Sequence, residues 1–266
     1  MTSPVSGRTA HIAWTRTGTP IEVLFLHGFS DSGACWDPVV RAVSPRWEVL
    51  TLDARGHGAS GLPDGPAGAS EHAADAAMVL DDQATVDGGV IVVGHSMGAG
   101  TAIALAELRP DLVRALVLED PVLRLPSEEP PERPPAGLPE GLRALRAMSL
   151  EQRIKQGRAE NPTWADDELE PWALAKAELA EDFTLHRPSV RPAPDLAAAT
   201  NCPVLLVRGD PDRGSIVTPG AASDAVRRAD GRIESVHITG VGHSIRREAR
   251  DRFLVELGAF LGRHAA

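Results

Sequence analysis

Short apolar runs alternate along this chain with segments whose apolar residues recur at helical spacing. The runs are rich in valine, isoleucine and leucine and are bounded by turn-forming residues, which is typical of buried strands. They are IEVLFLHG (21–28), WEVLTLDARGHG (47–58), GVIVVGHS (89–96), ALVLED (115–120), PVLLVRGD (203–210) and RIESVHITG (232–240). Strands that alternate with helices predict an α/β fold, in which helices cover both faces of a mostly parallel sheet. The segment RTAHIAWTRTG (8–18) is expected to add an antiparallel strand at the sheet's edge.

Helical patterns fill the intervals between these runs. Residues 36–45 predict a short helix that Pro45 ends. Residues 70–85 predict a longer helix that Ser70 can cap, and residues 244–262 predict the closing helix. The residues expected on the buried faces of these two longer helices are Ala73, Ala77, Met78, Leu80, Phe253, Leu254, Leu257, Phe260 and Leu261.

The alternation stops between residues 121 and 198. The stretch PVLRLPSEEPPERPPAGLPEG (121–141) contains too many prolines for a helix interior or a central strand. Helical patterns follow, one that begins at Ser149 with a capping box to Gln152 and one near 166–180. The expected apolar anchors of this region are Leu142, Leu145, Met148, Trp164, Trp172, Leu174 and Leu179. We therefore predict a helical lid at residues 121–198, inserted into a core domain made of residues 1–120 and 199–266.

Composition narrows the classes of partner. The 266 residues carry a formal net charge of −10 without an evident basic face, which argues against binding to nucleic acid. Cys35 and Cys202 make neither a disulfide framework nor a metal-binding spacing. The first residues lack the apolar stretch of a signal peptide, and no apolar run reaches the ~20 residues of a membrane helix. We expect a cytoplasmic monomer or homodimer that acts on a small molecule without a metal or cofactor and does not bind membranes.

The strongest local signal is Gly94-His95-Ser96-Met97-Gly98, which lies between an apolar run and an alanine-rich helical segment (97–109). In a strand, Gly-x-Ser-x-Gly, helix arrangement, the serine occupies a strained turn that exposes its hydroxyl at the N-terminus of the helix. This context favours a nucleophile over a turn whose glycines serve packing alone. A third interpretation is a dinucleotide-binding turn, since Gly94, Gly98 and Gly100 have the spacing G-x-x-x-G-x-G.

The dinucleotide interpretation fits less well. Such a turn normally follows the first strand of its fold, whereas this one follows at least two predicted strands. An acidic residue about 20 positions further on should bind the ribose, and Glu119 ends a strand near that distance. However, short-chain reductases with this glycine spacing use a tyrosine as acid, and the chain contains no tyrosine.

Four motifs in this order resemble the α/β-hydrolase superfamily, in its compact esterase-like branch. HGFSDSG (27–33) is similar to the family's oxyanion loop, DARGHGAS (53–60) to the turn after its fourth strand, GHSMG (94–98) to its nucleophile elbow and GVGH (240–243) to its histidine loop. The resemblance covers residues 20–120 and 200–262. It implies an eight-stranded, mostly parallel sheet and a covalent acyl-enzyme mechanism.

The resemblance also implies roles for single residues. Ser96 is the expected nucleophile, and His243 is the base that takes its proton. The backbone N–H groups of Phe29 and Met97, with Gly28 beside them, are expected to hold the oxyanion.

Two further groups of residues are assigned by position. Trp164 and Trp172 of the lid are expected to line the substrate pocket or to anchor the lid to the core. His27 and His57 belong to turn motifs, and His95 is expected to point away from Ser96.

The acid that orients His243 stays open in the sequence. The family usually places an aspartate after its seventh strand as G-x-x-D, followed closely by a proline. RGDPDRGSIVTP (208–219) puts Asp212 at that position, but the proline comes late. Some members carry a glutamate at the end of the sixth strand, where this chain has Glu119. Glu119 and Asp212 are the two main candidates, and Asp210 and Asp120 are the alternatives.

These expectations combine into a serine hydrolase that cleaves an ester or lactone of a small-to-medium hydrophobic molecule. A carbon–carbon bond hydrolase acting on a β-diketone would use the same residues and is one alternative. Another is a ligand-binding protein that retains the hydrolase fold. Members with an aspartate or a cysteine at the elbow are disfavoured because the residue here is Ser96, whereas cofactor-free dioxygenases and perhydrolases of the same fold remain open.

Overall fold

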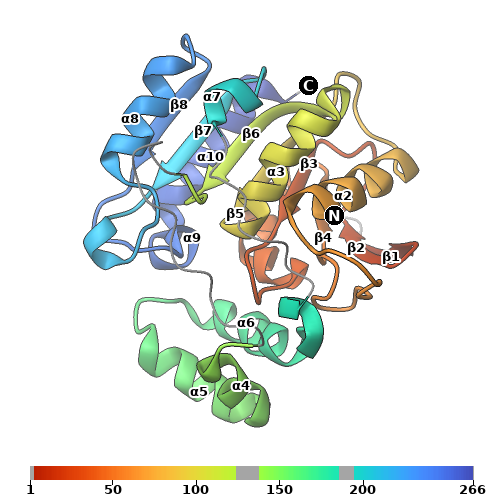
Figure 1. The fold of residues 1–266 in the computed structure, drawn as a ribbon, viewed down its shortest axis with the longest axis vertical. Helices are drawn as coiled ribbons and strands as arrows, with labels where there is room; N and C mark the ends of the chain where they lie inside the picture. The colour runs from red at the N-terminus through yellow and green to blue at the C-terminus, as the bar shows by residue number, and fades with distance from the viewer. Residues whose placement is uncertain (1–2, 124–137, 186–194, 266) are drawn as a thin grey trace.

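The computed structural model describes residues 3–123, 138–185 and 195–265 (Figure 1). Their strands form one eight-stranded sheet in the order β1-β2-β4-β3-β5-β6-β7-β8. The strands are β1 Val5–Thr9, β2 Ile12–Arg16, β3 Val23–Leu26, β4 Val49–Leu52, β5 Val90–His95, β6 Val113–Glu119, β7 Val204–Arg208 and β8 Ile233–His237. From β4 to β8 every neighbouring pair is parallel, which confirms the predicted fold class. The edge strand expected at 8–18 is instead an antiparallel hairpin, β1–β2, whose second strand pairs with β4.

Helices cover both faces of the sheet, and strand alternation decides which residue meets which helix. In β3, Leu24 and Leu26 pack with helices α2 and α3, while Val23 and Phe25 pack with α1 and α10 on the opposite face. The helices of this core are α1 Asp37–Val43, α2 Ala69–Asp82, α3 Met97–Leu108, α7 Leu196–Ala199, α8 Pro219–Arg228, α9 Ile245–Glu248 and α10 Arg250–His264. The short 3₁₀ helices are η1 Gly33–Trp36, η2 Pro110–Leu112, η3 Glu181–Leu185 and η4 Pro211–Arg213. Within the described ranges, no helix combines the length and the apolar character needed to cross a membrane.

Two details of the predicted helices are corrected. Helix α2 begins at Ala69 after Gly68, whose backbone N–H donates to the Glu71 carboxylate, so Ser70 is not the cap. The predicted closing helix is divided at Ala249 into α9 and α10, and in α10 the apolar side chains Phe253, Leu257 and Phe260 are buried as expected.

Three helices between β6 and β7 form what we call the helical insert (residues 138–185): α4 Glu140–Ala147, α5 Leu150–Glu160 and α6 Asp166–Glu178. Figure 1 shows α4, α5 and α6 together at one end of the molecule, with α6 on the side that faces the core. The capping box is present, because Gln152 N–H donates to Ser149 Oγ and Ser149 N–H donates to Gln152 Oε1. Leu174, expected to be an apolar anchor, is 39% exposed. The proline-rich stretch at 124–137 lies outside the described residues.

Candidate active site

Ser96 occupies the sharp turn between β5 and α3. Its φ of +52° is in the left-handed region, which a non-glycine residue adopts only at a cost in strain. Gly94 and Gly98 make this turn sterically feasible. A Cβ at Gly98 would overlap the Leu26 carbonyl, and a Cβ at Gly94 would overlap the first turn of α3. The glycine spacing therefore lets the turn, α3 and the end of β3 come into contact, and Ser96 is left half-buried at the N-terminus of α3.

Sheet register places an acidic residue beside Ser96. His95 pairs with Glu119 in neighbouring parallel strands, so the next positions, Ser96 and Asp120, also lie side by side. Ser96 N–H donates to the Glu119 carbonyl at 2.9 Å, and Asp120 N–H donates to the Val207 carbonyl at 2.9 Å. Asp120 also has a positive φ, +44°, so the chain bends just past the end of both strands.

The Asp120 carboxylate holds His243. His243 Nδ1 lies 2.6 Å from Asp120 Oδ2, and because a carboxylate only accepts, the imidazole proton is on Nδ1. The lone pair on Nε2 is then available as a base. The Asp120 side chain is fully buried, whereas the His243 side chain is 33% exposed. The structure thus joins the predicted histidine to a carboxylate that follows the strand next to that of Ser96.

The expectation that Glu119 or Asp212 orients His243 is wrong. Glu119 belongs to the face of β6 that also carries Ala115 and Val117, so its side chain points toward the opposite layer of helices. There it is fully buried and accepts from Arg246 N–H at 2.8 Å and from the Arg246 guanidinium at 3.0 Å. Asp212 lies exposed on η4.

The two remaining candidates, Asp210 and Asp120, differ in their partners. Asp210 accepts from Gly240 N–H and pairs with His237 Nε2, both at 2.6 Å, so it stabilises the loop after β8. In the observed register Gly94 pairs with Leu118 and His95 with Glu119, so Asp120, and not Glu119, lies opposite Ser96. The apolar runs themselves do not set this register, because matching their ends, Val93 with Leu118, would put Pro121 opposite Ser96.

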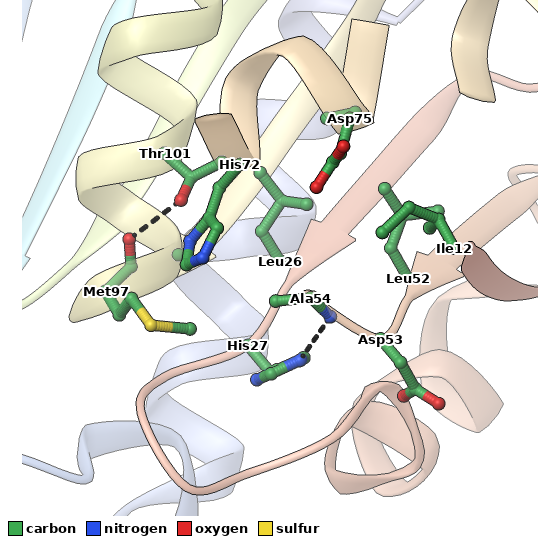
Figure 2. Close-up of a pocket in the computed structure, with 12 residues that line it drawn as sticks. Ile12, Leu26, His27, Leu52, Asp53, Ala54, His72, Asp75, Met97 and Thr101 are labelled. Atoms are coloured by element: carbon green, nitrogen blue, oxygen red, sulfur yellow. Dashed lines mark hydrogen bonds between the residues drawn. The ribbon is translucent and has the colours of Figure 1, made fainter. Parts of the chain in front are cut away.

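The segment His27–Phe29 follows β3 and lies against the first turn of α3. A Cβ at Gly98 would come within 2.7 Å of the His27 carbonyl, which shows how closely the two backbones approach. His27 has a structural place, as expected of a turn motif: its Nε2 accepts from Ala54 N–H at 2.9 Å and its Nδ1 donates to the Gly28 carbonyl at 2.8 Å. Figure 2 shows His27 and Met97 at the border of a small cavity between this segment, α2 and α3.

Apolar side chains lie next to this segment. Phe29 and Met97 are half-buried and pack against a cluster that joins the core to the helical insert. Phe29 also stacks on Phe183, with ring centroids 5.8 Å apart. The buried members of the cluster are Ala67, Leu138, Leu142, Leu179 and Phe183. The two residues expected at the oxyanion site therefore have an apolar neighbourhood.

Trp164 and Trp172 lie in the helical insert's own core. Their rings meet edge to face, with centroids 6.1 Å apart, and pack with Leu169 and Ala173. The Arg247 guanidinium lies 4.8 Å from the centre of the Trp164 ring, so the pair also anchors the insert to α9. Packing inside the helical insert accounts for the burial of both tryptophans.

A buried ion network, which no sequence pattern indicated, is centred on Asp31 in the segment after β3. Asp31, whose side chain is 4% exposed, contacts Lys176 of α6 at 3.1 Å, Arg246 of α9 at 3.2 Å and Arg247 of α9 at 3.1 Å. Burial alone would raise the pKa of Asp31, but the three cations outweigh it and hold that pKa well below its ordinary value. Arg247 also reaches Glu168 of α6, at 3.4 Å. In the described part of the chain, no three His, Cys, Asp or Glu side chains are grouped so that they could hold a metal ion.

Known proteins resemble this chain in sequence and in fold. The first relatives match it over little of their own length: a 2-(acetamidomethylene)succinate hydrolase of Mesorhizobium japonicum is 37% identical over 37% of this chain and 34% of its own length. Lipase LipV of Mycobacterium tuberculosis is 39% identical over 40% of this chain and 39% of its own length. N-formylmaleamate deformylase of Pseudomonas putida is 29% identical over 90% of this chain and 88% of its own length.

Solved structures share the whole fold at low sequence identity. E-2-(acetamidomethylene)succinate hydrolase superposes with a TM-score of 0.73 at 23% identity, covering 98% of this chain and 100% of that one. Est816, an N-acyl homoserine lactone degrading enzyme, superposes with a TM-score of 0.70 at 22% identity, covering 96% of this chain and 100% of that one. In sequence, residues 23–256 match the alpha/beta hydrolase family as a whole. This match spans the strained serine, its neighbouring aspartate and the histidine that the aspartate holds, and the chain belongs to the alpha/beta hydrolase family.

Proposed function

We propose that this chain is a serine hydrolase that cleaves an ester or lactone of a small-to-medium hydrophobic substrate through an acyl-enzyme. The observation that carries the proposal is the geometry of three residues. Ser96 lies on a strained turn, Asp120 follows the neighbouring strand in register, and Asp120 holds His243 by a 2.6 Å hydrogen bond. A turn that only packs would need neither the aspartate nor the histidine.

The proposed reaction follows from the proton positions. With its Nδ1 proton bound by Asp120, His243 takes the Ser96 proton on Nε2 while Ser96 Oγ attacks the carbonyl carbon. The oxyanion is stabilised by the Phe29 and Met97 amides, helped by the N-terminal dipole of α3. His243 then protonates the leaving alkoxide, and the same base activates the water that releases the acid.

The apolar cluster around Phe29 and Met97 supports a hydrophobic substrate. Leu142 of α4 and Leu179, just after α6, belong to this cluster, so the insert contributes to the surface next to Ser96. We propose that the helical insert is a lid that shapes the substrate pocket.

Amide hydrolysis is the second candidate function. The observation that favours it is the deformylase of N-formylmaleamate, which matches this chain over 90% of its length. The same serine and histidine would attack an amide carbonyl, and His243 would then protonate the departing nitrogen.

The test is a substrate panel on the wild type and on Ser96→Ala. The panel contains p-nitrophenyl esters of rising acyl length, lactones, an N-formyl amide and a β-diketone. We expect esters or lactones to be turned over and Ser96→Ala to lower kcat by about 10⁶-fold. A fluorophosphonate should label Ser96, as shown by peptide mass mapping. A folded wild type that neither labels at Ser96 nor turns over any substrate would favour a binding protein, and turnover of the β-diketone alone would favour the carbon–carbon hydrolase.

A further inference from the structure

His95, the residue before the proposed nucleophile, fills a space between two other segments of the site. Its ring is buried and lies beside the His243 ring, with centroids 4.7 Å apart. His95 Nε2 lies 3.1 Å from the main-chain carbonyl of His243. A carbonyl accepts only, so Nε2 carries the proton and donates it. The side chain thus ties the loop that carries His243 to the end of β5.

The other ring nitrogen faces the segment after β3. A Cβ at Gly28 would come within 2.6 Å of His95 Nδ1, so only a glycine there leaves room for this ring. Nδ1 is buried and has no hydrogen-bond partner among the described residues. The His95 imidazole therefore lies between Gly28 and His243, and His95 directly precedes Ser96 in the chain. Three segments of the proposed site are thus in contact through this residue.

The surroundings of His95 keep its ring neutral. Burial lowers the pKa of His95 well below its ordinary value, and the nearby Arg246 and His243 lower it further. Arg247 acts in the same direction, while Asp31 opposes it. A neutral ring next to His243 does not repel the positive charge that His243 gains when it takes the Ser96 proton.

We propose that His95 is a positioning residue, whose Nε2–H holds the main chain of His243 at the distance from Ser96 that proton transfer requires. This inference rests on the proposed function of Ser96 and His243. It assigns to His95 a contact with the histidine loop, where the sequence suggested only a side chain directed away from the serine. A bulky side chain that merely fills the space would pack equally well but would leave the His243 carbonyl without its donor.

Glutamine and asparagine at position 95 differ in side-chain length, so comparing them distinguishes hydrogen-bond donation to the His243 carbonyl from simple packing. The side-chain nitrogen of a glutamine reaches the place of imidazole Nε2, whereas that of an asparagine reaches only the place of Nδ1. We therefore compare His95→Gln, His95→Asn and His95→Phe, the last of which fills the space without a donor. The readouts are kcat and KM with the best ester of the panel, and concentrations are corrected by the fraction of protein that unfolds cooperatively.

We expect His95→Gln to keep kcat within about threefold of the wild type, while His95→Asn and His95→Phe lose about 10²-fold in kcat at similar KM, the cost of a displacement near 1 Å. Equal activity of His95→Phe and His95→Gln would overturn the proposal, because packing would then suffice. A folded His95→Gln as inactive as His95→Asn would overturn it as well.

A readout without turnover separates this inference from the proposed function. The Nδ1 proton between His243 and Asp120 is expected to give a downfield proton NMR resonance. We expect it unchanged in His95→Gln and shifted or broadened in His95→Asn, even if the wild type cleaves none of the substrates. A resonance that is identical in all variants would contradict the positioning role, whereas a missing Ser96 label in the wild type would contradict the hydrolase.

Discussion

At the scale of single residues, the Asp120 carboxylate determines how the site is built. It accepts from His243 Nδ1, from Ser215 Oγ at 2.6 Å, and from Ile216 N–H at 2.8 Å and Val217 N–H at 3.0 Å. The last three donors belong to the loop after β7, so this loop contributes its donors to the site while Asp212 stays exposed. A buried carboxylate with this many donors is fixed in place before any substrate binds.

Replacing Asp120, Glu119 and Asp212 one at a time by their amides distinguishes an acid that supports catalysis from one that supports stability. We expect Asp120→Asn to lower kcat by about 10⁴-fold with little change in KM, since the amide no longer fixes the His243 tautomer. Glu119→Gln breaks the buried pair with Arg246 and is expected to lower the free energy of unfolding by about 3–5 kcal/mol while the folded fraction stays active. Asp212→Asn is the control, because its side chain is exposed. Steady-state kinetics measures the effect on kcat, and thermal unfolding measures the effect on stability. A large loss of kcat in Asp212→Asn would mean that Asp212, in the loop after β7, orients His243.

At the scale of elements, helix α6 shows what periodicity can and cannot predict. Its existence follows from local pattern, as does that of the elbow, whose glycines lie close to Ser96 in sequence. Yet Leu174 faces solvent, whereas Lys176 is buried and donates to the Ser30 carbonyl at 2.7 Å. Lys176 is buried because Asp31, far away in sequence, supplies the opposite charge. For the same reason the sequence left the acid next to His243 open, with Asp120 only as an alternative, because the choice depends on register between two separate strands.

The two lysines of the chain offer a matched test of how the helical insert is held. Lys176→Met would leave part of the Asp31 charge uncompensated, and we expect it to lower the free energy of unfolding by about 3 kcal/mol. Lys155→Met, in the exposed face of α5, should stay within about 0.5 kcal/mol. Thermal unfolding measures stability, and limited proteolysis measures the exposure of α4 to α6. If both variants unfold alike, the ion network does not hold the insert.

At the scale of the whole molecule, the sheet brings distant segments to one edge. Phe29, Ser96, Asp120 and His243 all follow the carboxyl ends of parallel strands, where ligands bind in open α/β sheets. The alternation of strands and helices was enough to predict this edge. It could not predict that histidines would be buried around it, among them His27, His57 and His95. Burial lowers the pKa of each of these histidines, so each is neutral in the folded protein.

Buried neutral histidines make the stability of the whole chain depend on pH. When the pH falls below about 6.5, the unfolded chain binds protons at these positions more readily than the folded chain, so each histidine lowers the free energy of unfolding by at most about 1.4 kcal/mol per pH unit. Burial raises the pKa of Glu119, so its effect on stability has the opposite sign and begins closer to the ordinary pKa of a glutamate. The lowered pKa of Asp31 affects stability only in stronger acid. We therefore expect the urea midpoint to change little between pH 7.5 and pH 7 and to fall from about pH 6.5 to pH 5.5. His57→Phe keeps a ring against Phe29 and Phe183 and removes one of these proton sites, so its slope should be shallower by up to about 1.4 kcal/mol per pH unit. Equal slopes in the variant and the wild type would mean that His57 binds a proton as readily folded as unfolded, against its burial.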